Sequence, residues 1–441
     1  MIAVDMVPVA VAAAGALGLS ARMCVWRRRP ASMRSNPVQT VVAEAPAVLR
    51  GAVMCFAVTV NARKMFADLG LASREKGFPT VAWWDYDRHG LAVELLMVGG
   101  QSLADWADDK TLKAMADYVG VPSISATSPA PGWVRLQVRV VDTLAESTTR
   151  STAAPEGVDL QAVPVGIRED GDLWLLRILY AHILLAGATG SGKGSVLWSI
   201  LLGLGPAIKA GVVDVWLADP KGGAEFGRGE NRLFVRFATD AATILATLEE
   251  AVRAMDERLA SMRAAGVRKH VPTSDEPLIL IIIDEAASLS SYADRADQER
   301  FRQLTGQLLS KGRAAAVSVV AALQDPSKET MPNRQLFPVR VGLRLDEPTQ
   351  TTMVHGQGSR LRGARCDEIS SDTPGVGYVG EDGTTEFVRV RAFWIDDDQA
   401  DAIVDTYSPA PEITGPATDY SGFDPDDLGD EHPDDGEAVA A

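Results

Sequence analysis

Short unbroken apolar runs, separated by glycine-rich or polar segments, are the main pattern in the second half of the chain. Residues 278–283 consist only of Leu and Ile, and the mostly apolar run at 181–186 is separated by a glycine-rich segment from a third run at 196–204. Short runs of this kind are typical of strands buried on both faces of a parallel sheet. Their alternation with helical segments predicts an α/β domain with a parallel-rich sheet over residues 158–398.

The first half has a different pattern, with two β-rich runs on either side of a turn-like Asp-Arg-His-Gly segment. A capping-box sequence beginning at Ser102 and a glycine at position 120 bound one expected helix. We therefore predict a small α+β domain of ββαββ type at residues 36–145, followed by a Ser-, Thr- and Ala-rich linker at 146–157. Its strands and helix are expected at 80–86, 91–98, 102–119, around 124 and at 133–141, with a core that includes Trp83, Trp84, Trp106 and Trp133.

The N-terminal segment, residues 1–35, holds sixteen uncharged residues at 6–21, followed by Arg22 and an arginine cluster at 27–29. This stretch is shorter than the roughly 20 residues that span a bilayer. We predict an N-terminal apolar helix that associates with the cell membrane, as a single span or peripherally, with the rest of the chain in the cytoplasm. A buried helix is the alternative, and a cleaved signal peptide fits less well because the arginines follow the apolar segment.

The net charge of −16 is concentrated at the C-terminus. Residues 409–441 contain ten acidic side chains and no Lys or Arg, which leaves 49 acidic against 43 basic side chains elsewhere. This tail is predicted to be disordered, and the balance of the remainder does not exclude a nucleic-acid partner. Three distant cysteines and five scattered histidines argue against a disulfide framework or a structural metal site.

Residues 187–195 have the composition of a phosphate-binding loop between a strand and a helix. Backbone N–H groups of such a loop and the following helix N-terminus bind phosphate, and Lys193 is expected to reach the outer phosphates of ATP. The position after this lysine, commonly Ser or Thr, is glycine, so Ser195 becomes the candidate Mg²⁺ ligand. The expected ATP-binding residues are Gly187, Ala188, Thr189, Gly190, Ser191, Gly192, Lys193, Gly194 and Ser195.

Asp284 and Glu285 follow the apolar run at 278–283 directly, at the predicted carboxyl end of a buried strand. Ligands of open α/β sheets bind at this end of the strands. Asp284 is expected to hold the Mg²⁺ shell, and Glu285 to orient and polarise the attacking water. Together with the loop, the two carboxylates predict an ATPase.

Three further motifs accompany the nucleotide-binding residues. They are Leu-Ala-Asp-Pro-Lys-Gly-Gly-Ala-Glu-Phe at 217–226, Gly-Arg-Ala-Ala at 312–315 and Val-Val-Ala-Ala-Leu-Gln-Asp-Pro at 319–326. Taken in this order they resemble the FtsK/SpoIIIE family of DNA-pumping ATPases. The resemblance extends over residues 158–394, and the variant loop most resembles the actinobacterial branch that moves conjugative plasmids and integrative elements as duplex DNA.

This resemblance implies a ring, expected to be a hexamer, with double-stranded DNA in the centre and ATP between subunits. Gln324 would sense the γ-phosphate, and an arginine of the neighbouring subunit, Arg340 or alternatively Arg344, would stabilise transition-state charge. An ordinary salt bridge or a DNA phosphate contact is the alternative for both arginines. Lys221 is not assigned a catalytic role.

The predicted function is an ATP-driven double-stranded DNA translocase that serves conjugative transfer of a plasmid or integrative element. No winged-helix module is recognised after Trp394, so directionality is expected to come from a DNA-loading or conjugation partner protein or from another surface of the chain. The alternatives are an ATPase that drives protein export, a phage or chromosome DNA motor of the same superfamily, and a catalytically weak scaffold.

Overall fold

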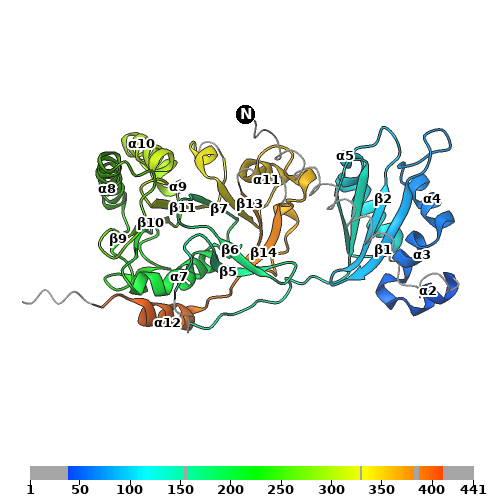
Figure 1. Cartoon of the computed structure of the whole chain (residues 1–441), viewed down its shortest axis with the longest axis horizontal. Helices are drawn as coiled ribbons and strands as arrows, with labels where there is room; N and C mark the ends of the chain where they lie inside the picture. The colour runs from blue at the N-terminus through cyan, green and yellow to red at the C-terminus, as the bar shows by residue number, and fades with distance from the viewer. Residues whose placement is uncertain (1–37, 153–156, 328–329, 382–386, 411–441) are drawn as a thin grey trace, which may run out of the picture.

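The computed structural model describes residues 38–152, 157–327, 330–381 and 387–410. Within these ranges the chain forms two sheets with their helices, side by side along the long axis of the molecule (Figure 1). The predicted N-terminal apolar helix lies outside the described residues, as does the acidic tail beyond residue 410. Among the helices that are described, none is long and apolar enough to cross a bilayer.

The smaller sheet contains four described strands in the order β1-β2-β4-β3, all antiparallel to their neighbours. Helices α2 to α4 lie on the side of this sheet that faces away from the larger sheet (Figure 1). The ring of Phe66 packs edge-on against the fully buried Trp106, at 5.5 Å between centroids. The bounds are α2 Val38–Glu44, α3 Arg50–Phe56, α4 Thr59–Asp68, β1 Thr80–Asp87, β2 Gly90–Leu96, β3 Ser123–Thr127 and β4 Trp133–Arg139.

The helix expected at 102–119 is two helices, α5 (Leu103–Ala107) and α6 (Asp109–Val119). Asp108 between them is extended, at φ −62° and ψ 133°, and its carboxylate accepts the Thr111 N–H at 3.1 Å. An aspartate in this conformation caps a new helix instead of continuing the previous one. The prediction for Trp83 was also wrong, because its side chain is 38% exposed.

Ten described strands form the larger sheet, in the order β6-β5-β14-β13-β12-β7-β11-β10-β8-β9. The run from β12 to β9 is parallel, and the pairs from β12 to β6 are antiparallel. The predicted parallel-rich sheet is confirmed, whereas its antiparallel half was not predicted. The strands are β5 Val163–Arg168, β6 Leu173–Leu176, β7 Ile183–Ala186, β8 Val213–Ala218, β9 Arg236–Ala238, β10 Leu278–Ile283, β11 Val317–Leu323, β12 Val339–Leu343, β13 Val376–Glu381 and β14 Val388–Ala392.

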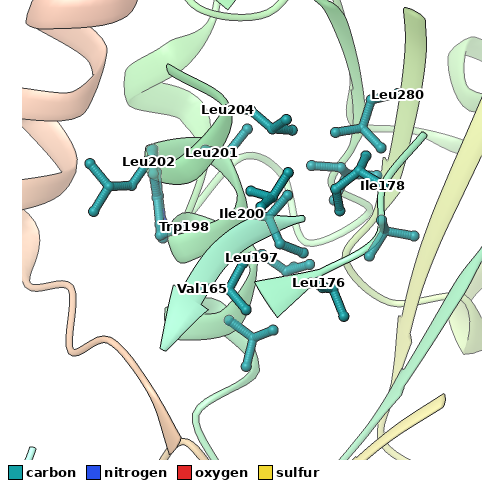
Figure 2. Close-up of a cluster of buried hydrophobic side chains, with 14 of the residues drawn as sticks. Val165, Leu176, Ile178, Leu197, Trp198, Ile200, Leu201, Leu202, Leu204 and Leu280 are labelled. Carbon is teal, nitrogen blue, oxygen red and sulfur yellow. The ribbon is translucent and has the colours of Figure 1, made fainter. Parts of the chain in front are cut away.

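Helices cover both faces of this sheet, with α7 and α12 on one face and α8 and α10 on the other (Figure 1). The apolar side of α7 packs Leu197, Ile200 and Leu201 against strand residues such as Val165 and Leu280 (Figure 2). Each such burial contributes about 1.5–3 kcal/mol. The helices are α7 Lys193–Lys209, α8 Ala241–Ala265, α9 Ala287–Ser290, α10 Arg295–Lys311, α11 Pro348–His355 and α12 Asp397–Tyr407.

Ion pairs connect the two sheets. The carboxylate of Asp109 on α6 contacts Arg360 at 2.5 Å and also Arg365, and Asp142 contacts Arg389 on β14 at 2.7 Å. Because these groups come from both parts, they fix the smaller sheet against the antiparallel half of the larger one.

The close contact between α7 and α12 leads to a stability prediction. A Cβ on Gly205 of α7 would lie 2.3 Å from the ring of Tyr407, which is buried on α12. We expect Gly205→Ala to lower the free energy of unfolding by about 1–2 kcal/mol, since overpacking outweighs the gain in helix propensity. Thermal unfolding followed by circular dichroism measures this change.

Gly99→Ala is the matched control, because nothing lies within 4 Å of the added carbon. An unchanged or higher Tm for Gly205→Ala would contradict the packing of α12 on α7.

Candidate nucleotide-binding site

The phosphate-binding loop connects the end of β7 at Ala186 to the start of α7 at Lys193. Gly192 in this loop has φ +95°, a conformation that favours glycine. A Cβ at this position would lie 2.3 Å from the backbone nitrogen of Gly375. The same Gly375 N–H donates to the Ser191 carbonyl at 2.8 Å. The close passage of the segment before β13 therefore requires glycine at 192.

Two neighbouring strands hold the loop by backbone hydrogen bonds. Gly187 N donates to Leu323 O at the end of β11 (3.1 Å), and Ala188 N donates to Arg344 O just after β12 (2.8 Å). Side chains also hold the next residue, Thr189. Its hydroxyl donates to the Gln324 amide oxygen (3.1 Å), and its carbonyl accepts from the Arg344 guanidinium (2.7 Å). Gln324 and the loop therefore form one bonded unit.

Lys193 folds back onto the loop. Its ammonium donates to Gly187 O at 2.7 Å and to Ala188 O at 3.3 Å, and the residue is only 9% exposed. Burial lowers the pKa of this lysine, an effect that Glu285 opposes. Phosphate oxygens are stronger acceptors for an ammonium than these carbonyls and would restore its charge balance.

Asp284 and Glu285 lie at the end of β10 with different partners. Asp284 is 1% exposed and forms a salt bridge with Lys221 at 2.7 Å. Glu285 is 6% exposed, and its Oε2 has no hydrogen-bond partner. Burial raises the pKa of Glu285, while Lys193 and Lys221 lower it. A buried carboxylate with one unpartnered oxygen suits the positioning of a water molecule.

The segment after β8 adds residues that were not predicted to belong to the site. Buried Asp219 accepts the Lys221 N–H at 3.0 Å, and the segment turns at two glycines with positive φ. It thereby brings Lys221 and Glu225 to the first turn of α7. A cleft of 390 Å³ opens there, lined among others by Gly194, Ser195, Trp198, Lys221, Glu225 and Ile395.

The structure brings most of the predicted residues together. Lys193 is electrostatically coupled to Asp284 and Glu285, and Gln324 contacts the loop. Arg340 does not join this cluster, because its guanidinium donates to the carbonyls of Phe337 (3.1 Å) and Val354 (3.3 Å). Arg344 instead lies on the loop of its own chain. A role for either arginine in a neighbouring subunit stays a prediction.

Magnesium chemistry fits this donor set. In the described part of the chain no three His, Cys, Asp or Glu side chains are grouped closely enough to hold a metal ion. Mg²⁺ in nucleotide sites is commonly bound by one or two carboxylates together with phosphate oxygens and waters. Asp284, next to the loop, meets that requirement, whereas Ser195 is half-buried on the cleft wall.

Comparisons with known proteins agree with the geometry. The FtsK/SpoIIIE family matches residues 150–276, which include the loop. "Transfer protein TraSA" of Streptomyces ambofaciens is 27% identical over 328 residues, covering 69% of this chain and 76% of the relative. "DNA translocase FtsK" of Mycobacterium leprae is 25% identical over 354 residues, covering 74% of this chain but only 39% of the relative. The chain thus spans less than half of that translocase.

Among solved structures, the conjugation coupling protein TcpA of pCW3, described as a monomer form with ATPγS, has a similar fold. The TM-score is 0.52 at 20% sequence identity, and the match covers 78% of this chain and 97% of that chain. This likeness supports the P-loop fold described above.

The contact of Arg344 with the phosphate loop of its own chain, called its cis role below, leads to a prediction about nucleotide affinity. Arg344→Ala removes the donor to the Thr189 carbonyl, and we expect binding of a fluorescent ATP analogue to weaken by about 1 kcal/mol, roughly fivefold. Because the contact lies within one chain, the loss should appear at concentrations where the protein is monomeric. Fluorescence anisotropy measures it, with Arg232→Ala as the control, since this arginine pairs with Asp405.

Unchanged affinity of monomeric Arg344→Ala, combined with lost turnover in the assembled protein, would contradict the cis role and place Arg344 in a neighbour's site.

Proposed function

We propose that this chain, whose residues 150–276 match the FtsK/SpoIIIE family, is an ATP-driven translocase of double-stranded DNA that serves conjugative transfer of a plasmid or integrative element. The observation that carries the proposal is the gathering of Lys193, Asp284, Glu285 and Gln324 at one edge of the sheet. The similarity to the transfer protein TraSA, 76% of which is covered by the match, supports the transfer context.

Each residue has a proposed role in hydrolysis. Lys193 exchanges the carbonyls of Gly187 and Ala188 for the outer phosphates, where its charge is needed. Glu285 accepts a hydrogen bond from the attacking water on its unpartnered oxygen. Gln324 transmits the state of the γ-phosphate through its bond to Thr189. Bound Mg²⁺, with Asp284 in its shell, supplies charge neutralisation of the phosphates.

The proposed assembly is a hexameric ring of motors formed by residues 158–398, with ATP between subunits and duplex DNA in the channel. Such a motor binds backbone phosphates more than base edges, so its affinity depends weakly on sequence and strongly on salt. An arginine of the neighbouring subunit completes each site, and Arg340 is the preferred candidate because Arg344 contacts the loop of its own chain. We also propose that the N-terminal segment associates with the membrane. A partner protein would load the DNA.

The catalytic assignment predicts different defects for two variants. We expect Lys193→Ala to lose ATP binding and turnover, because its ammonium lies buried against the loop where the phosphates would bind. We expect Glu285→Gln to bind ATP but to hydrolyse it at least about 100-fold more slowly, since general-base contributions are of that order. Binding by anisotropy and turnover by phosphate release separate the two. Parent-like turnover in Glu285→Gln would exclude Glu285 as the residue that activates water.

The DNA partner is tested by ATP turnover of the full chain with and without linear duplex DNA across a salt series. We expect strong stimulation that declines as salt rises, because each phosphate contact releases counterions. Single-stranded DNA of equal length is the control. Turnover that is indifferent to duplex DNA in an assembled ring would count against the translocase and favour a motor for protein export.

A further inference from the structure

Position 194 is where this loop departs from the common pattern, and the space beside it is filled. Phosphate loops of this class commonly carry a Ser or Thr after the lysine, whose hydroxyl binds Mg²⁺. Here a Cβ built on Gly194 would lie 1.5 Å from Oε1 of Glu225 and 2.7 Å from its Cδ. A covalent single bond is about 1.5 Å long. The carboxylate oxygen is therefore about as far from this Cβ as the hydroxyl oxygen of a serine would be.

We propose that Glu225 supplies the oxygen that the loop lacks, as a ligand of the hydrated Mg²⁺ that accompanies ATP. Gly194 and Glu225 then form one functional unit, in which the absence of a side chain on α7 makes room for a carboxylate from the segment after β8. This inference rests on the proposed ATPase function and deepens it by adding a metal ligand.

Packing of the next residue positions the backbone of Glu225, whose side chain is exposed. The next residue, Phe226, is fully buried and stacks on Trp198 of α7, with ring centroids 5.2 Å apart and an interplanar angle of 22°. Trp198 lies four residues after Gly194, so the two residues lie on the same side of the helix. Figure 2 shows Trp198 on α7. The stacked pair therefore holds the Glu225 backbone opposite the first turn of α7.

The electrostatic surroundings favour a cation. Glu225 is electrostatically coupled to Asp284 and Asp219 as well as to Lys193 and Lys221. Asp219 is fully buried and its Oδ2 has no hydrogen-bond partner, and Glu285 has an unpartnered Oε2. When phosphates engage Lys193, these carboxylates lose part of their positive surroundings. A hydrated divalent cation would replace this lost positive charge. Carboxylate and phosphate oxygens are the ligands that Mg²⁺ prefers.

Ser195 is a weaker candidate for this role. It follows Gly194 on α7, and successive residues of an α-helix are rotated by about 100°. Its side chain therefore leaves the helix in a different direction from the one that Glu225 Oε1 occupies.

The test compares nucleotide affinity in Mg²⁺ and in EDTA for the parent and three variants of the full chain. The variants are Glu225→Gln, Glu225→Ala, and the double variant Gly194→Ser with Glu225→Ala. We expect both single variants to lower the Mg²⁺-dependent gain in affinity for a fluorescent non-hydrolysable ATP analogue about tenfold or more, in the range of lost metal-site contacts. The double variant should recover most of the gain, because the serine hydroxyl has space once the carboxylate is gone.

Glu230→Gln is the matched control, since this exposed glutamate belongs to the same segment and does not line the cleft. Electron paramagnetic resonance of Mn²⁺ in the presence of the analogue provides a second readout, and the Mn²⁺ affinity should follow the same order. Glu225→Gln keeps the shape of the side chain, so a defect limited to Mg²⁺ conditions is not a folding defect.

An unchanged Mg²⁺ dependence in both single variants would overturn the inference, as would a double variant no better than Glu225→Ala. A parent protein that binds no nucleotide at all would contradict the proposed ATPase together with this site. A parent that binds nucleotide with Mg²⁺ but ignores duplex DNA would contradict only the translocase.

Discussion

Two backbone hydrogen bonds, from Gly187 to Leu323 and from Ala188 to Arg344, are the constraint on which the rest of the site depends. They tie the phosphate loop to the ends of β11 and β12, on either side of the strand from which it emerges. Parallel strands end at the same edge of a sheet, so the loop, the β10 carboxylates and Gln324 are brought to one place. The apolar faces of α7 and α8 stabilise this sheet from both sides.

Two lysines offset part of the negative charge within the site. Lys193 is bound to loop carbonyls, and Lys221 pairs with the buried Asp284. Isolated buried carboxylates are costly, and these two ammonium groups offset that cost. When a nucleotide and its metal ion bind, Lys193 would exchange carbonyl oxygens for phosphate oxygens, and Asp284 would exchange an ammonium for a metal cation. The site is therefore organised before the ligand arrives, with one glutamate oxygen left for water.

The antiparallel half of the large sheet connects this site to the smaller sheet. β13 follows the Pro374-Gly375 contact with the loop, and Arg389 on β14 pairs with Asp142. Arg360 and Arg365 contact Asp109 of the smaller part. Contacts thus run from the phosphate loop through the antiparallel half to the smaller sheet. Partly exposed ion pairs are individually weak, so the two parts are held by several such pairs together.

The parallel strands, the phosphate loop and the roles proposed for Lys193, Asp284 and Glu285 could all be predicted from the sequence, because apolar runs, glycines and strand-end carboxylates are local signals. The antiparallel half of the sheet, the contact of Arg344 with its own loop and the proximity of Glu225 to Gly194 became visible only in the folded chain. These contacts join residues far apart in the chain. Their proximity follows from strand order and from packing such as Phe226 on Trp198, which no local pattern specifies.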